Sequence, residues 1–309
     1  MKFLIIGTGS IGTRHLQNLK SLGHSVFVYD FNLARLEEVC STFGAESYDP
    51  LSHIVHFDAW LICTPPYAHV PWANEAIKHG SHVFIEKPIS HTLMGVDDLL
   101  NKAKEANVLL YVGYQLRFHP AIQEIKRLIE SGKIGTIHTI SAEFGQWLPD
   151  WRPNADYQCT YTAHKSMGGG ILLDASHELD YVQFLVSAPV SKVCCFINKL
   201  SELDTDAEEN ADIVLQFENG TNASVHLDYL NKVYTREVEM IGSKTSVRCN
   251  VDRQSELYVQ ELKHFIRCIE GKEKPMVDGY SAKCTLEVAL ACRESAETGN
   301  IIRFRGANG

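Results

Sequence analysis

Three residues of this sequence have the types and positions needed for proton transfer at an alcohol. Lys87 follows an apolar stretch and precedes a proline, so its ammonium is expected at the end of a buried strand, where it can stabilise a developing alkoxide. A histidine side chain ordinarily titrates near neutral pH, so His177 is a candidate to accept the hydroxyl proton. Asp174 stands three residues earlier in a segment predicted as helix, so both side chains are expected on one helix face. Asp174 is then placed to orient the substrate hydroxyl or the imidazole.

Each of these residues also has a purely structural interpretation. A lysine at a strand end can simply pair with a surface carboxylate, and a histidine in an apolar helix is often a core residue that hydrogen-bonds the backbone. For Asp180, one turn beyond His177, the structural interpretation is that it pairs with a structural arginine and has no other role. The ordered set of motifs described below favours the catalytic interpretation for Lys87 and His177.

A glycine-rich turn near the N-terminus predicts a dinucleotide-binding site. Gly7, Gly9 and Gly12 directly follow the apolar run 2–6 and open a helical pattern, which is the context that the G-x-G-x-x-G motif requires. The first glycine allows a tight turn, the second lets the backbone approach the pyrophosphate, and the third permits close packing of helix against strand. The helix N-terminus then supplies N–H groups for the phosphates.

Asp30 ends the second predicted strand and bears on the choice of cofactor. A carboxylate at this position hydrogen-bonds the adenosine ribose and repels a 2′-phosphate, which favours NAD over NADP. Arg14 and Arg35 are close enough in sequence to leave NADP open.

The elements expected around these residues form two domains. In residues 1–118, strands alternate with helices, which predicts a Rossmann-type, doubly wound parallel sheet. The expected strands are 2–6, 24–30, 58–63, 82–88 and 108–114, and the expected helices are 11–23, 32–43, 67–79 and 92–106. Residues 119–309 contain successive strands with short turns, which predicts an α+β domain with a large, open, mostly antiparallel sheet and helices on one face. Its expected strands are 135–147, 190–198, 210–218, 221–230, 234–241 and 244–249, and its expected helices are 119–131, 171–186, 255–270 and 279–298.

Composition excludes several classes of protein. The formal net charge of -9 argues against a nucleic-acid or membrane-surface role, because such partners require basic patches. No segment is apolar over the length needed to cross a bilayer. The nine cysteines include no C-x-x-C pair, which indicates thiols of a reducing compartment and predicts a cytoplasmic protein. No H-E-x-x-H or similar spacing is present, so no metal site is expected.

Taken in order, the motifs of the chain resemble the Gfo/Idh/MocA family (glucose–fructose oxidoreductase, inositol dehydrogenase and relatives) over essentially the full length. After the fingerprint GTGSIG come Thr64-Pro65-Pro66 with His69, similar to the family's T-P-x-x-x-H loop, and Glu86-Lys87-Pro88, similar to its E-K-P signature. The segment GGGILLDASHELD (168–180) resembles the family's glycine-run motif. The resemblance implies that His177 is proton acceptor and donor, that Lys87 is its partner and that Asp174 binds substrate.

Further site residues are expected from these motifs. The expected cofactor-binding residues are Gly7, Thr8, Gly9, Ser10, Ile11, Gly12, Asp30, Thr64, Pro65, His69, Glu86, Lys87 and Gln115. Gln115 and Arg117 stand where the family often has an N-x-R-F-like sequence. Alternatively, Arg117 holds the two domains together. The aromatic-rich stretch 147–166 is where substrate loops should lie. Its candidate substrate ligands are Trp151, Arg152, Tyr161 and Lys165, with Arg152 or Lys165 meeting a carboxylate or phosphate and Trp151 alternatively anchoring domain packing.

The resemblance implies an NAD(P)-dependent oxidoreductase. It would transfer hydride between nicotinamide and a secondary alcohol or ketone of a sugar, amino sugar or nucleotide sugar, with surface-sugar biosynthesis as one setting. The alternatives are a reductase of a non-sugar substrate, such as a dihydrodiol, and a non-catalytic NAD-sensing regulator of the same fold. The family further implies a homodimer or homotetramer formed through the C-terminal sheet.

Overall fold

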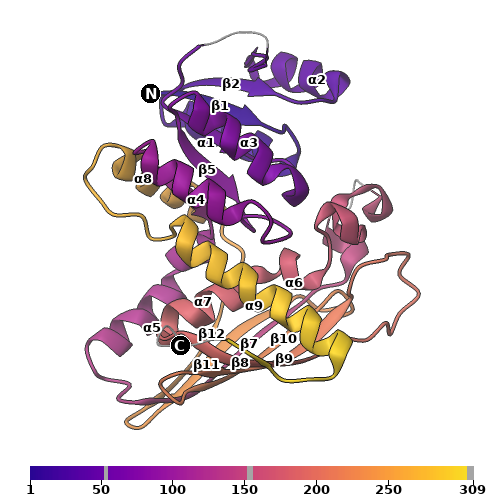
Figure 1. The fold of residues 1–309 in the computed structure, drawn as a ribbon, viewed down its shortest axis with the longest axis vertical. Coiled ribbons are helices and arrows are strands. Elements are labelled where there is room, and N and C mark those ends of the chain that lie inside the picture. Colours follow the sequence, from indigo (N-terminus) through magenta and orange to yellow (C-terminus); the bar gives the residue numbers. More distant parts are fainter. Residues whose placement is uncertain (52–54, 152–155, 305–309) are drawn as a thin grey trace. The chain divides into compact units, whose positions relative to one another are not determined.

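The computed structural model describes residues 1–51, 55–151 and 156–304, and the chain divides into two compact units (Figure 1). The first unit contains Met1–Gln115 and Ser255–Lys283, and the second contains Leu116–Gln254 and Cys284–Gly309. The division is therefore not a single cut after residue 118, because a later segment returns to the first unit. Among the described residues, no helix is both long and apolar enough to span a membrane.

The first unit is built on a six-stranded, fully parallel sheet of order β3-β2-β1-β4-β5-β6. This confirms the predicted doubly wound sheet. The strand order reverses beside β1, and ligands of such sheets bind outside the carboxyl ends of the strands at that point. The strands are β1 (Lys2–Ile6), β2 (Ser25–Tyr29), β3 (Glu46–Ser47), β4 (Ala59–Ile62), β5 (His82–Glu86) and β6 (Leu110–Gly113).

Five α-helices and a short 3-10 helix accompany this sheet within the described part of the first unit. They are α1 (Ser10–Ser21), α2 (Leu33–Phe43), η1 (Pro66–Ala68), α3 (His69–Lys78), α4 (Val96–Glu105) and α8 (Glu256–Ile269). The 3-10 helix η2 (Gln115–Phe118) lies where the chain passes into the second unit.

Helix α8 joins the first unit because its apolar face completes the core there. Leu262 and Phe265 are fully buried in one cluster with Leu16, Phe84 and Tyr111. The rings of Phe84 and Phe265 meet edge to face with centroids 5.4 Å apart. Burying a phenylalanine contributes about 1.5–3 kcal/mol, which is enough to fix the place of this segment.

The second unit contains a seven-stranded sheet of order β12-β11-β7-β10-β9-β8-β13. Its strands are β7 (Ile137–Gly145), β8 (Val190–Phe196), β9 (Asn210–Phe217), β10 (Asn222–Asp228), β11 (Thr235–Gly242), β12 (Ser246–Asn250) and β13 (Ile302–Arg303). All neighbours pair antiparallel except β7 and β10, which run parallel at the centre. The prediction of a mostly antiparallel sheet is confirmed, and the parallel pair brings the carboxyl ends of β7 and β10 together.

Helices α6 (Ile171–Asp174) and α7 (Ser176–Val186) cover one face of this sheet (Figure 1). The single helix expected over 171–186 is interrupted at Ala175, whose φ of -100° and ψ of 29° are not helical. The hydroxyl of Ser176 donates to the carbonyl of Leu173 at 2.9 Å, and such local bonds compete with regular helix bonding. The other helices of the unit are α5 (Pro120–Glu130), α9 (Gly279–Thr298), which starts in the first unit, and the 3-10 turns η3 (Leu148–Trp151), η4 (Tyr157–Cys159), η5 (Tyr161–Ala163) and η6 (Lys165–Met167).

Candidate active site

The glycine turn between β1 and α1 has the geometry that a dinucleotide fingerprint requires. Gly7 has a φ of +93°, a conformation that L side chains rarely adopt. A Cβ on Gly12 would lie 1.9 Å from the carbonyl oxygen of Gly7, so only glycine lets helix and turn approach this closely. A Cβ on Gly9, in contrast, would meet nothing within 4 Å. The turn is tightly packed on its inner side and open at Gly9, as expected if a ligand approaches the backbone there.

Asp30 ties the end of β2 to this turn. Its Oδ2 accepts hydrogen bonds from the backbone N–H and the hydroxyl of Thr8, at 2.7 and 2.9 Å. Its Oδ1 accepts from the N–H of Asn32, and Arg35 lies 3.6 Å from Oδ2. Arg14 is engaged elsewhere, with its guanidinium 4.6 Å from the centroid of the Tyr258 ring. Of these two arginines, Arg35 is therefore the one beside the carboxylate that is predicted to bind the ribose.

Asp30→Asn is expected to shift the cofactor preference toward NADP by about tenfold or more, because it removes a negative charge and leaves Arg35 free to meet a 2′-phosphate. Fluorescence titration with NADH and NADPH measures the two dissociation constants. Glu38→Gln on the exposed side of α2 is the matched control, and its ratio of constants should equal that of the unmodified chain. An equal loss of affinity for both cofactors in Asp30→Asn would contradict this role.

The loop after β4 is fastened to the loop after β5 by His69. The buried imidazole has Nδ1 2.8 Å from the carbonyl oxygen of Pro88 and Nε2 2.8 Å from that of Thr64. Burial lowers the pKa of His69 below its ordinary value. The hydrogen bonds to the two carbonyls raise the pKa, but by less than burial lowers it. The predicted residues Thr64, Pro65 and His69 thus lie together, and His69 acts on the shape of the site through the backbone.

Glu86, at the end of β5, has a buried partner that the sequence did not suggest. His15 of α1 places Nε2 2.6 Å from Oε1 of Glu86, and the histidine is fully buried. Gln115 donates to the hydroxyl of Tyr258 at 3.2 Å, and burial followed by the charge of Glu86 raises the pKa of Tyr258 to about 12. Lys87 follows directly, half-buried, before a cis bond to Pro88. Glu86 and Gln115, both predicted as cofactor-binding, therefore belong to one polar cluster at the carboxyl end of the sheet.

Asp174 and His177 are both buried in the second unit, at 6% and 5% exposure. The hydroxyl of Tyr229, which directly follows β10, donates to Oδ2 of Asp174 at 2.7 Å. Burial, the charge of Asp174 and this hydrogen bond raise the pKa of Tyr229 well above its usual range, so it remains a donor at neutral pH. The predicted substrate ligand Tyr161 lies close enough to Tyr229 to raise this pKa slightly further. Asp174 is thereby held as an oriented carboxylate.

Glu178 and Arg236 were not expected from the sequence. Glu178 is fully buried beside His177 in the chain, and Oε1 lies 2.9 Å from Nε of Arg236. The guanidinium of Arg236 also covers the ring of Phe144 at 4.3 Å. A buried glutamate paired with a largely buried arginine thus lies next to a predicted catalytic residue, and its only sequence signal was the unusual glutamate inside an otherwise apolar helix pattern.

The remaining predicted substrate residues have different surroundings. Arg117 forms a buried two-bond pair with Asp180, at 2.7 and 2.8 Å, which is the structural alternative raised for Asp180. Trp151 donates from Nε1 to the carbonyl of Gln146 at 3.2 Å. Lys165 is exposed and lies 3.3 Å from Glu297. Arg152 lies outside the described residues.

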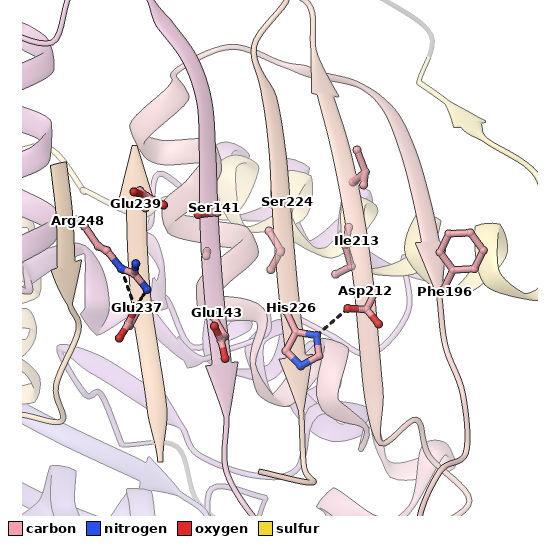
Figure 2. Close-up of a pocket in the computed structure, with 13 residues that line it drawn as sticks. Ser141, Glu143, Phe196, Asp212, Ile213, Ser224, His226, Glu237, Glu239 and Arg248 are labelled. Atoms are coloured by element: carbon pink, nitrogen blue, oxygen red, sulfur yellow. Dashed lines mark hydrogen bonds and ion pairs between the residues drawn. The ribbon is translucent and has the colours of Figure 1, made fainter. Parts of the chain in front are cut away.

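The open face of the second sheet, through which the family resemblance implies an oligomer contact, carries mainly polar side chains. It forms a shallow hollow of about 370 Å³, in which Arg248 pairs with Glu237 and His226 with Asp212 (Figure 2). Residues alternate along each strand, so the apolar side chains turn toward the helices and the polar ones outward. None of the predicted catalytic or cofactor residues lines this hollow.

His226 is expected to make stability pH-dependent. Hydrogen bonding to Asp228, at 3.1 Å, and then to Asp212, at 2.7 Å, outweighs burial and raises the pKa of His226 to about 9. Because the folded-state pKa lies above the unfolded one, the stabilisation is fully present below about pH 6.5 and is lost as the pH rises through about 9. The side chain is 42% exposed, so solvent screening limits the effect to about 1 kcal/mol or less.

Urea unfolding of His226→Gln and the unmodified chain at acidic and alkaline pH tests this expectation. The two free energies of unfolding should differ near pH 6 and converge near pH 10, at about the limits set by the two pKa values. The exposed His138 lies on β7 of the same sheet, and His138→Gln serves as the control. A difference that persists unchanged at alkaline pH would refute the charge-based explanation.

Comparison with known proteins agrees with this geometry. Residues 1–114 match the model of an oxidoreductase family with an NAD-binding Rossmann fold, and residues 122–248 match the GFO/IDH/MocA C-terminal domain. Myo-inositol 2-dehydrogenase of Thermotoga maritima is 27% identical over 96% of each chain. The uncharacterised oxidoreductase YrbE of Bacillus subtilis is 30% identical over 82% of this chain and 75% of that protein. The crystal structure of a probable dehydrogenase from Thermotoga maritima superposes with a TM-score of 0.86, at 26% identity and 98% coverage of both chains. The chain belongs to the Gfo/Idh/MocA family of oxidoreductases, and its first unit is the NAD-binding Rossmann fold of that family.

Proposed function

We propose that the protein is an NAD-dependent dehydrogenase that interconverts a secondary alcohol and a ketone on a sugar, amino sugar, nucleotide sugar or inositol. The observation that carries the proposal is that this member of an NAD-binding oxidoreductase family contains both Lys87 and His177. Lys87 directly follows β5 and is half-buried, and His177 lies in the first turn of α7 and is buried. A regulator that had lost catalysis would not need either residue.

Two observations support NAD binding by the first unit. The space at Gly9 is open, and, within residues 1–51, no side chain caps the N-terminus of α1, so its N–H groups are available for phosphates. The turn Gly7–Gly12 would hold the pyrophosphate and Asp30 the ribose. Thr64, Pro65 and Gln115 would line the nicotinamide end. When bound there, NAD supplies the hydride acceptor.

The chain's own residues handle the proton and the charge. His177 accepts the proton of the substrate hydroxyl as its carbon is oxidised, and returns it in the reverse direction. Lys87 donates a hydrogen bond to the same oxygen and stabilises its alkoxide character in the transition state. Asp174, oriented by Tyr229, accepts a hydrogen bond from a substrate hydroxyl and fixes the ring.

Formation of NADH over a panel of inositols, hexoses, N-acetylhexosamines and nucleotide sugars tests the proposal. The expected result is turnover with at least one member, in both directions when the corresponding ketone and NADH are supplied. Tight NADH binding without turnover of any member would overturn the proposal in favour of a sensing role.

We also propose a subunit contact and a compartment. The open sheet face exposes Phe196, Val214 and Ile241, by 65%, 54% and 40%, between complementary charges, which supports association with a second copy. Sedimentation velocity tests this directly, and a monomer at micromolar concentration would contradict it. All nine cysteines are free thiols, which supports a cytoplasmic location.

A further inference from the structure

Two cations of the second unit lie on aromatic rings instead of beside carboxylates. The guanidinium carbon of Arg253 is 4.7 Å from the centroid of the Tyr234 ring, and the ammonium of Lys232 is 2.7 Å from that of Trp147. Within the described residues, neither cation forms an ion pair, and both side chains are exposed. Their positive charges are therefore in contact with aromatic rings and are not neutralised by an ion pair within the described ranges.

Other arginines of the same unit behave differently. Arg117, Arg236 and Arg293 are each paired with a carboxylate, at 2.7, 2.9 and 2.7 Å respectively. The charges of those guanidinium groups are neutralised by carboxylates of the protein itself. Arg253 instead donates to the neutral amide oxygen of Gln146, and no carboxylate in the described part of the chain forms an ion pair with it. A guanidinium pre-oriented in this way matches the two oxygens of a carboxylate or a phosphate.

A short chain of contacts joins Arg253 to the predicted catalytic carboxylate. Gln146, only 8% exposed, accepts from Arg253 through its side chain and from Trp151 through its backbone carbonyl. The ring of Trp151 meets that of Tyr229 edge to face at 5.1 Å. Tyr229 in turn holds Asp174. The two cations thus lie at the same end of the central strands as Asp174, since Gln146 and Tyr229 directly follow the parallel pair β7 and β10.

We propose that Arg253, assisted by Lys232, forms an anion subsite that selects a sugar substrate carrying a carboxylate or phosphate group. The inference rests on the proposed function, because it gives the chemical class of the substrate that the same site would take. Arg253 binds the anionic group through two N–H donors, and its stacking on Tyr234 reduces the conformational entropy lost on binding. Lys232 adds a point charge on the Trp147 side. Neutral inositols and hexoses use Asp174 but leave this subsite unfilled.

Calorimetric titration of the NADH-bound full chain with matched pairs of sugars tests the subsite. The pairs are glucose with glucuronate, glucose with glucose 6-phosphate, and N-acetylglucosamine with UDP-N-acetylglucosamine. In at least one pair, the charged member should bind the unmodified chain about tenfold to a hundredfold more tightly than the neutral one. A preference in the first pair identifies a carboxylate, and a preference in the others identifies a phosphate.

Arg253→Gln should abolish the preference and leave the affinity for neutral sugars and for NADH unchanged. Arg253→Lys, which keeps the charge but not the fork, should retain part of it. Arg248→Gln is the matched control, because Arg248 is exposed on the open sheet face and already paired with Glu237, so its loss should not alter the preference. Equal binding within every pair by the unmodified chain would overturn the inference, as would an equal loss for charged and neutral sugars in Arg253→Gln.

The experiments distinguish failure of the dehydrogenase proposal from failure of the anion subsite. Preferential binding of charged sugars that Arg253→Gln removes, without NADH formation, supports the subsite and contradicts the proposed reaction. Oxidation of neutral sugars at rates that Arg253→Gln does not change, with no preference for charged ones, supports the reaction and overturns the subsite.

Discussion

Replacing Lys87 by methionine is expected to lower kcat for sugar oxidation about a thousandfold, because the transition state loses the donor that stabilises its developing alkoxide. His177→Asn should cost a similar factor, since no group then accepts the hydroxyl proton. Because the proposed mechanism assigns both residues to the same substrate oxygen, the double variant should be little slower than either single one. Single-turnover formation of NADH measures all three rates.

Two measurements separate a catalytic effect from damage to the fold. Both variants should keep the thermal midpoint and the NADH dissociation constant of the unmodified chain. Lys78→Met, on the exposed side of α3, removes the same charge from a lysine that pairs with Glu75 of its own helix, and this variant should turn over normally. Full turnover by Lys87→Met would refute the mechanism, whatever the substrate proves to be.

Alanine at two glycines of the turn is expected to give opposite outcomes. Gly12→Ala places a methyl group 1.9 Å from a carbonyl oxygen, so the turn must open. The expected cost is about 3 kcal/mol or more in the free energy of unfolding, with loss of NAD binding. Gly9→Ala meets nothing within 4 Å and should leave stability unchanged, but it should weaken NAD binding about tenfold or more by keeping the pyrophosphate from the backbone.

Thermal unfolding with and without NAD, together with NADH titration, distinguishes the two glycine variants. A Gly12→Ala protein as stable as the unmodified chain would show that the turn is not packed as described. A Gly9→Ala protein with full NAD affinity would show that the phosphates bind elsewhere.

The first unit was largely predictable from local sequence because its signals are local. Buried parallel strands read as continuous apolar runs, and the glycine turn requires glycine wherever the fold occurs. That α8 belongs to the first unit was not predictable from the sequence. Its amphipathic pattern shows that Leu262 and Phe265 must be buried, but nothing in that pattern says that Phe84 is their partner.

In the second unit, the motif is enough to propose Asp174 and His177 as site residues, but not to predict how the chain arranges them. The break at Ala175 depends on competing hydrogen bonds that helix periodicity does not describe. Tyr229 lies 55 positions from Asp174, and Arg236 lies on a different strand from any motif. Such pairings arise from strand register, which a single sequence leaves undetermined.

The most direct test of the central claim follows the hydrogen atom itself. A sugar that forms NADH in the panel is prepared with deuterium on the oxidised carbon and incubated with NAD and the unmodified chain. Deuterium should appear on C4 of the nicotinamide ring, on one face only, and Lys87→Met and His177→Asn should both suppress it. NADH formed without deuterium, or no transfer from any member of the panel, would contradict the assignment as an NAD-dependent sugar dehydrogenase.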